Sequence, residues 1–307
     1  MTGFDKNLRG IVAIVASQLA FLLNDTLIKV ASERLPFGEI IFIRGIFAVL
    51  FVSVGVVALG LHRQLASVAN RFVSWRIAGE LGGTFFYLLA LFQMPIATAT
   101  IIFQAVPLSV TAGAALFLGE AVGWRRWTAI GIGILGVLIV IRPGLAAFDV
   151  FGILVLVSVL FVTLRDLATR AVPVVIPTLL MTLATAVAVA SMGALIGLTE
   201  DWVTPGGADF LSLAAAGGFL AIGYFTAIAA MRLGDISVTA PFRYVAVVMA
   251  IAVGYLVWRD VPDALTILGS IIIVGTGLYT LYRERQASRR GRPLVAAPAA
   301  IDPPTGR

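Results

Sequence analysis

The sequence has no cysteine and only one histidine in 307 residues. The lack of cysteine excludes disulfides, thiolate nucleophiles and cysteine-ligated metal sites. The sequence also lacks the HExxH pattern of zinc proteases, the GxSxG pattern of serine hydrolases and a phosphate-binding glycine loop. These absences argue against an enzyme, and we expect neither a cofactor nor a metal site.

Charged residues are also scarce, at 12% of the chain, whereas 60% of the residues are hydrophobic and the mean hydropathy is +1.03. A bilayer core takes roughly 20 apolar helical residues to cross. Runs of this length recur along the whole chain, so the sequence predicts an all-α polytopic membrane protein. The ten predicted transmembrane helices cover residues 10–32, 37–60, 72–92, 95–118, 125–142, 150–170, 177–198, 210–231, 236–258 and 264–282.

Positive charge gathers on one side of these predicted spans. With a cytoplasmic N-terminus, the outer loops carry only three arginines, namely Arg34, Arg142 and Arg259. The inner side receives Lys6, Arg9, Arg63, Arg71, Arg76, Arg125, Arg126, Arg170, Arg232 and the cluster from Arg283 onward. This asymmetry predicts cytoplasmic N- and C-termini in an inner membrane. It also explains the net charge of +6 without nucleic acid, because the basic side faces anionic lipid.

The first apolar run could instead be a signal peptide, since Lys6 and Arg9 precede it. However, it continues into the polar pair Asn24–Asp25 and has no small-residue cleavage site. We therefore interpret it as a helix of the mature protein.

Two segments of the chain resemble each other at a constant offset of about 140 residues. The stretch "LNDTLIKVA" (23–31) aligns with "LRDLATRAV" (164–172), and "FLGEAV" (117–122) aligns with "VWRDVP" (257–262). This offset predicts two repeats of five helices, at 10–142 and 150–282, followed by a disordered cytoplasmic tail at 284–307. Five is odd, so the second repeat is inverted in the membrane, as is typical of secondary transporters.

Each repeat places an acid one helical turn before a base, which predicts the pairs Asp25–Lys29 and Asp166–Arg170. Charges inside a bilayer normally face a cavity or a partner. We interpret the pairs as two lids, one near each mouth of a central pathway. The alternative is that each pair neutralises itself and anchors its helix near an interface.

Several polar residues share helix faces and are candidates for the cavity lining. For Arg243 and Glu80 the alternative is a buried structural ion pair, formed with each other. For the aromatic residues the alternative is plain packing. The candidates are Gln18, Asn24, Asp25, Arg44, Glu80, Tyr87, Gln104, Asp166, Arg243 and Tyr244.

The motifs "MPIATATIIFQAVPLSVTAGAALFLGE" (94–120), "GILGVLIVIRPG" (133–144) and "GDISVTAPFRY" (234–244) carry a family resemblance. The chain resembles ten-helix, EamA-type members of the drug/metabolite transporter superfamily over residues 10–282. It is loosely similar to S-adenosylmethionine and riboflavin uptake members. The resemblance implies proton- or gradient-linked passage of small metabolites between two repeats. The second copy has "WRD" where the first has "LGE", which puts equal roles for Glu120 and Asp260 in doubt.

The sequence thus predicts a secondary transporter that moves a small zwitterionic or amphipathic metabolite across the inner membrane by alternating access. The alternatives are a passive channel or facilitator and a multidrug or metabolite exporter; a membrane-embedded enzyme is the remotest hypothesis. The expected partners are the small-molecule substrate, the lipid bilayer, and a coupling proton or exchanged solute. Helices 125–142 and 264–282 carry almost no internal polar groups, which predicts either a scaffold or the surface of a homodimer.

Overall fold

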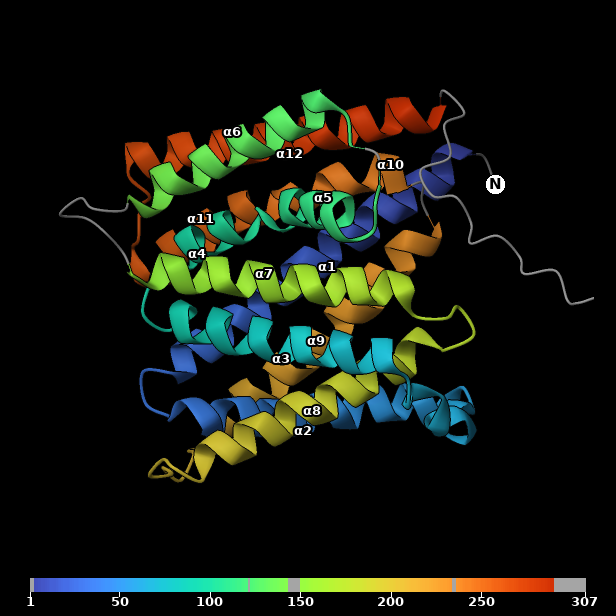
Figure 1. Ribbon diagram of the computed structural model, residues 1–307. Helices are drawn as coiled ribbons and strands as arrows, with labels where there is room; N and C mark the ends of the chain where they lie inside the picture. Colours follow the sequence, from blue (N-terminus) through green and yellow to red (C-terminus); the bar gives the residue numbers. More distant parts are fainter. Residues whose placement is uncertain (1–2, 121, 143–149, 234–235, 290–307) are drawn as a thin grey trace, which may run out of the picture.

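The computed structural model describes residues 3–120, 122–142, 150–233 and 236–289, and within them it contains helices and no strands. Figure 1 shows these helices as a bundle of nearly parallel rods. They are α1 (Gly3–Ala31), α2 (Phe37–Ala58), η1 (Leu61–Val68), α3 (Arg71–Leu91), α4 (Ile96–Phe103), α5 (Val106–Phe117), α6 (Trp124–Ile141), α7 (Val150–Ala171), α8 (Thr178–Gly197), α9 (Gly207–Leu233), α10 (Ile236–Thr239), η2 (Ala240–Tyr244), α11 (Val245–Trp258) and α12 (Ala264–Arg289).

Every predicted span falls on helix, but two of the spans are interrupted. The span 95–118 is divided into α4 and α5, and the span 236–258 into α10, η2 and α11. Proline occupies the first turn of α5 and of η2. Because proline lacks an amide hydrogen, it fits at a helix start and interrupts a continuous helix.

Nine helical segments in the described part of the chain are long and apolar enough to cross a membrane. They confirm an all-helical, multi-pass membrane protein. The predicted span 72–92 is helix α3, which is not among the nine; its polar residues include Arg76 and Glu80. Ten crossings therefore remain a prediction. The predicted tail at 284–307 starts within α12, which runs to Arg289, and its remaining residues lie outside the described part.

Helices of the first half pack on helices of the second half. The main partners are α1 with α9, α2 with α8, α3 with α7, and α6 with α12. From top to bottom, Figure 1 shows α6 with α12, then α4–α5 with α10–α11, then α1 with α7, α3 with α9, and α2 with α8. The two halves therefore interleave through the bundle and form no separate lobes.

Two interhelical hydrogen bonds recur at equivalent places in the two halves. The Ser17 hydroxyl on α1 donates to the carbonyl of Gly223 on α9 over 2.9 Å. The Ser158 hydroxyl on α7 donates to the carbonyl of Gly83 on α3 over 2.8 Å. The serines are 141 positions apart and the glycines 140. The α1–α9 and α7–α3 contacts are therefore built in the same way.

The turns after α5 and α11 also match. Gly119 and Arg259 have φ angles of 69° and 60°, in the left-handed region. The amides of the next residues, Glu120 and Asp260, each donate to the carbonyl six positions earlier, over 3.2 and 3.1 Å. The "LGE" and "WRD" sequences thus form the same turn, even though an arginine replaces the glycine that usually adopts this conformation.

Helices α2 and α8 approach closely because glycine faces backbone at their contact. A Cβ atom at Gly193 would lie 2.5 Å from the amide nitrogen of Phe42. Helices pack this tightly in membranes where small residues meet.

We expect Gly193→Ala to destabilise the protein by about 1–3 kcal/mol, because the added methyl forces α2 and α8 apart. The matched control is Gly131→Ala on α6, where a Cβ would meet no atom within 4 Å. Thermal unfolding in detergent measures both. Equal melting temperatures for the two variants would contradict the expectation.

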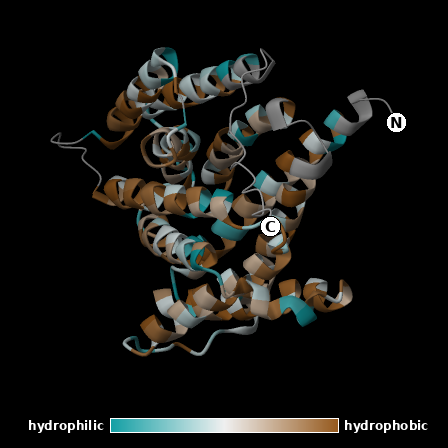
Figure 2. Cartoon of the chain, turned by 45° about the vertical axis from the view of Figure 1, so that its right-hand side comes forward, coloured by the Kyte–Doolittle hydropathy of each residue, from teal (hydrophilic) through white to brown (hydrophobic). Residues whose placement is uncertain are grey.

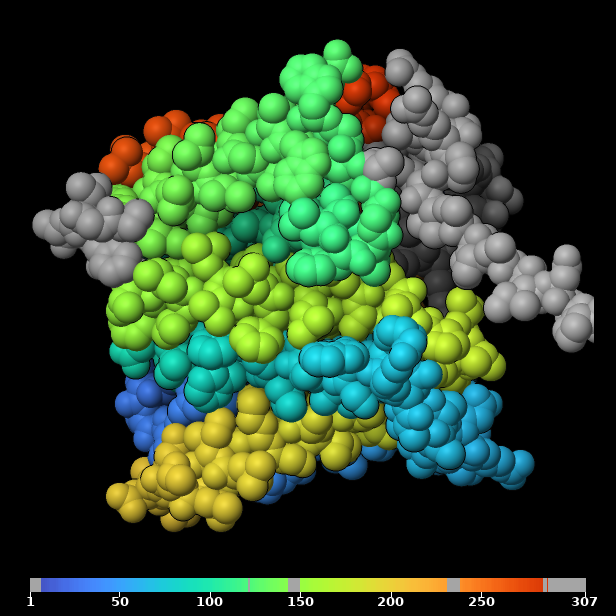
Figure 3. All heavy atoms as spheres, viewed as in Figure 1, coloured from blue at the N-terminus to red at the C-terminus, as the bar shows by residue number. Residues whose placement is uncertain are grey.

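The outer surface of the bundle is apolar. Figure 2 shows mostly hydrophobic residues along the helices, and Figure 3 shows one face formed by α6, α7, α3 and α8. Large exposed hydrophobic side chains include Val54, Val57, Leu135, Leu160 and Leu195. Exposed apolar area of this extent is suited to lipid contact.

Candidate functional site

A central cavity of about 840 Å³ lies between the two halves of the bundle. Its lining includes Arg170 and Thr280, near the end of the bundle at which α1 begins. It reaches inward to Asp25, Tyr87 and Thr100. The opposite end is filled by apolar side chains of low exposure, among them Leu35, Ile40, Leu91, Met94 and Ile96. The cavity therefore extends from one end of the bundle and stops before the other.

Nine of the residues predicted for the site line this cavity: Gln18, Asp25, Arg44, Glu80, Tyr87, Gln104, Asp166, Arg170 and Arg243. Asn24, Lys29 and Tyr244 are not part of the lining. Asn24 lies behind Asp25 and is 2% exposed. The Tyr244 side chain is buried against Gly277 of α12.

Asp25, at the inner end of the cavity, is held by uncharged donors. Its carboxylate accepts hydrogen bonds from the Asn24 amide at 2.9 Å and from the Tyr87 hydroxyl at 3.0 Å. The Arg44 guanidinium donates to the Asn24 carbonyl oxygen over a longer 3.4 Å. Asp25 thus joins α1 to α3 without a direct ion pair among the described residues.

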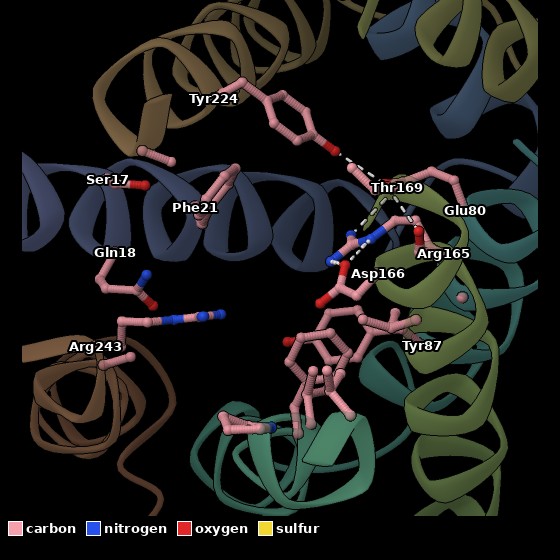
Figure 4. A pocket seen from close by; sticks show the side chains of 18 of the residues that line it. Ser17, Gln18, Phe21, Glu80, Tyr87, Arg165, Asp166, Thr169, Tyr224 and Arg243 are labelled. Atoms are coloured by element: carbon pink, nitrogen blue, oxygen red, sulfur yellow. Dashed lines mark hydrogen bonds and ion pairs between the residues drawn. The ribbon is translucent and has the colours of Figure 1, made fainter. Parts of the chain in front are cut away.

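Asp166, the counterpart of Asp25, has a cationic partner. Arg165 donates to it at 2.8 Å and also donates to Glu80 at 3.1 Å. The second oxygen of Glu80 accepts from the Tyr224 hydroxyl at 2.9 Å. Figure 4 shows this network on one side of the cavity. It ties α3, α7 and α9 together through the buried Glu80 and through partly buried Arg165, Asp166 and Tyr224.

Glu80 therefore does not form the ion pair with Arg243 that was the alternative to a functional role for these two residues. Glu80 pairs with Arg165, which the sequence analysis did not single out, and Tyr224 was also missed. The sequence carried a signal for both residues. At the repeat offset Arg165 aligns with Asn24, and Tyr224 aligns with Thr84, which already shares a helix face with Glu80.

The Arg243 guanidinium makes no hydrogen bond or ion pair with any described residue, although its backbone carbonyl accepts from the Gln104 amide at 3.3 Å. Arg243 is exposed and lines the cavity. In Figure 4 its side chain extends from its helix across open space towards Tyr87 and Asp166. An arginine placed in this way presents a planar fork of donors suited to a carboxylate.

The predicted pairs within α1 and α7 are not formed. The Lys29 ammonium donates instead to the carbonyls of Leu91 and Met94, at 2.6 and 2.8 Å, and lies 5.5 Å from the Trp258 ring centre. The physical reason is that the carbonyls ending α3 need donors, and a long lysine side chain reaches them.

Arg170 likewise bonds to a neighbouring helix end. Its guanidinium donates to Glu120, at the turn after α5, over 2.9 Å. Asp166 is already bonded to the adjacent Arg165, so Arg170 is left to pair elsewhere. Lys29, near the end of α1, thus contacts residues at and just after the end of α3, and Arg170, near the end of α7, contacts the turn that follows α5.

Comparisons with known proteins agree with this architecture. Residues 8–142 match the EamA-like transporter family. The chain is 25% identical to an S-adenosylmethionine uptake transporter of Rickettsia conorii, over 92% of this chain and 96% of that protein. It is 28% identical to the pseudopaline exporter of Pseudomonas aeruginosa, over 86% of this chain and 93% of that protein.

A riboflavin transporter of Vibrio cholerae is 25% identical over 94% of this chain and 98% of that protein. A crystal structure superposes with a TM-score of 0.60 at 20% identity, covering 88% of this chain and 98% of the other, which supports the fold alone. The family and the relatives are transporters rather than enzymes. The predicted resemblance to EamA-type drug/metabolite transporters is thus confirmed, and the chain is a multi-pass membrane protein whose residues 8–142 match the EamA-like transporter family.

Proposed function

We propose that this protein is a secondary transporter that moves a small zwitterionic or amphipathic metabolite across the inner membrane by alternating access. The observation that carries the proposal is the central cavity, which is charged along its lining and ends before one end of the bundle. Its volume of about 840 Å³ is within the range of small-molecule sites. The names of the relatives indicate small organic solutes.

The proposal includes two inverted repeats, at 10–142 and 150–282. Supporting it are the matched Ser17 and Ser158 hydrogen bonds and the matched turns at Gly119 and Arg259. If each half can adopt the conformation of the other, a cavity that opens at one end becomes a cavity that opens at the other. The described structure is then the inward-open state, because α1 begins at the open end and its N-terminus is cytoplasmic in the proposed topology.

Counterflow in liposomes tests the proposal against its main alternative. Purified protein is reconstituted in vesicles loaded with unlabelled S-adenosylmethionine or riboflavin, and uptake of the labelled compound is followed. A carrier shows uptake accelerated by the internal solute and a rate that saturates. Uptake that rises linearly with solute concentration, and that is not accelerated by internal solute, would favour a passive channel. The same assay with a pH gradient across the vesicle membrane tests for a coupling proton. A carrier can move its solute in either direction, so the gradients of the solute and of any coupling ion decide whether the protein imports or exports it.

Single cysteines test the orientation without background, since the chain has none of its own. We expect a cysteine at Gln64, exposed in η1, to be labelled only from the cytoplasmic side. A cysteine at Thr204, exposed between α8 and α9, should be labelled from outside by an impermeant maleimide. Labelling of both from the same side would contradict the proposed topology.

The lid function is proposed for Asp25, Lys29, Asp166 and Arg170 at the two ends of the pathway. We expect Lys29→Met to loosen the closed end, because the carbonyls of Leu91, at the end of α3, and of Met94, just after it, lose their donor. External labelling of a cysteine at Thr100 should then rise about fivefold, a change within the range of ordinary conformational coupling.

The matched control for Lys29→Met is Arg170→Met. It removes the equivalent cation at the open end and should leave external labelling of the Thr100 cysteine unchanged. An equal rise in both variants would indicate general loosening of the fold and would contradict a lid at Lys29.

A further inference from the structure

The cavity lining has an excess of positive charge. Apart from Arg126, it contains five arginines and four carboxylates, which leaves an excess of one positive charge. Unbalanced charge within a membrane is costly, and such residues normally face a partner. These arginines are Arg44, Arg76, Arg165, Arg170 and Arg243, and the carboxylates are Asp25, Glu80, Glu120 and Asp166.

The excess is concentrated in arginines that lack a carboxylate hydrogen-bond partner. Arg44 and Arg76 are 4% and 8% exposed, and they donate to neutral groups, the Asn24 carbonyl oxygen and the Thr185 hydroxyl. The Nε atom of each is buried and without a partner among the described residues. Both arginines line the cavity without a carboxylate hydrogen-bond partner, so an anionic ligand would balance their charge.

Arg243 adds a third cation, which lies across open space from Tyr87 and Asp166 in Figure 4, and its guanidinium is not bonded to any described residue. Asp25 is the complementary case. Among the carboxylates of the lining, it is the one whose hydrogen-bond partners in the described part of the chain, Asn24 and Tyr87, are both uncharged. The cavity thus offers three cations without a carboxylate hydrogen-bond partner and one acid without a direct cationic partner.

We propose that the transported solute is a zwitterion with an excess of acid, carrying one cationic nitrogen and at least two carboxylates. The nitrogen is bound by Asp25, and the carboxylates are bound by Arg243 and by Arg44 with Arg76. This inference rests on the proposed transport function and names its substrate class. A cationic solute without an excess of acid would add to the positive charge of the lining.

Binding to the full chain in nanodiscs tests the inference directly. The probes are L-glutamate, iminodiacetate and glutathione, each with one amine and two carboxylates, compared with glutathione diethyl ester and S-adenosylmethionine. We expect at least one acidic probe to raise the melting temperature at millimolar concentration, with no shift from the ester. Because the chain has no cysteine, thiol exchange cannot imitate glutathione binding.

Variants identify the groups that bind. Arg243→Gln should raise the dissociation constant of the bound acid about thirtyfold or more, as for the loss of one partner in a desolvated charge pair. Arg243 is exposed to the cavity, so this change should leave folding intact. Asp25→Asn should weaken binding of the amino dicarboxylate but leave binding of glutarate, which lacks the nitrogen, unchanged. Arg63→Gln, on exposed η1, is the control that should alter neither constant.

Stronger stabilisation by S-adenosylmethionine or by the ester than by every acidic probe would overturn the inference. Binding of no acidic probe, or unchanged binding in Arg243→Gln, would also overturn it. The proposed function fails differently: acids that bind but show no counterflow would contradict transport and leave the ligand class standing. Counterflow of S-adenosylmethionine without binding of any acidic probe would support transport and contradict the proposed ligand class.

Discussion

Arg243→Ala is expected to abolish transport, by about a hundredfold or more, in a protein that still inserts and folds. The guanidinium lines the cavity without a bond to any described residue, so its removal leaves no buried partner unpaired. A desolvated cation that binds a substrate carboxylate contributes several kcal/mol to affinity by truncation, on the order of 2–5 kcal/mol. The initial rate of counterflow and the melting temperature, measured on the same preparation, separate transport from folding.

The variant Arg243→Lys tests whether the charge of Arg243 is sufficient or its planar donor group is needed. Lysine keeps the charge but replaces the planar fork with a compact ammonium group. We therefore expect normal insertion and transport reduced by about tenfold, an intermediate result. Transport at the wild-type rate in Arg243→Ala would show that the side chain does not bind the solute. Loss of folding in both variants would instead give Arg243 a structural role.

The second large effect is expected at Glu80, and it concerns stability. Glu80 connects α3 to α7 through Arg165 and to α9 through Tyr224, and its side chain is 9% exposed. Removing one partner of a buried ion pair costs on the order of 3–5 kcal/mol. Because Arg165 keeps Asp166, we expect Glu80→Gln to cost about 3 kcal/mol, the lower end of this range.

The matched control is Glu120→Gln. Glu120 also accepts from an arginine, but the Arg170 side chain is 47% exposed. Exposed ion pairs contribute about 0–1 kcal/mol, so this variant should unfold close to the wild-type temperature. Thermal unfolding in detergent measures both variants. A melting temperature for Glu80→Gln equal to that of Glu120→Gln would mean that the network around Glu80 does not hold the three helices together.

The helices could be predicted from the sequence because each apolar run is a local property. The predicted span 37–60 is α2 at Phe37–Ala58, and the predicted span 177–198 is α8 at Thr178–Gly197. The interruption between α4 and α5 was signalled by Pro107, which bends a helix. The sequence did not reveal where the interruption lies, because the chain leaves the helix at Gln104 and Ala105, before the proline.

Asp25, Glu80 and Arg243 were candidates from the sequence and line the cavity, and their role in a functional site stays a prediction. A shared helix face can be read from spacing alone, whereas the pairings between residues were not predicted. Partners across helices depend on which helices pack together. Spacing within α7 favoured Arg170 as the partner of Asp166, whereas the adjacent Arg165 reaches both this acid and Glu80 on α3. The α3–α7 contact that permits this bridge has no signal in the local sequence.

The interleaving of the two halves has a consequence for how the protein is made. Ser17 on α1 bonds to Gly223 on α9, which is 206 residues later in the chain. At a synthesis rate of about 5–20 residues per second, α1 waits roughly 10–40 s for this partner. During that time polar groups such as Glu80 and Arg76 reside in the membrane without their final partners on α7, α8 and α9. Insertion and assembly are therefore separated in time, and the nascent first half depends on lipid headgroups, water or the insertion machinery to shield its charges.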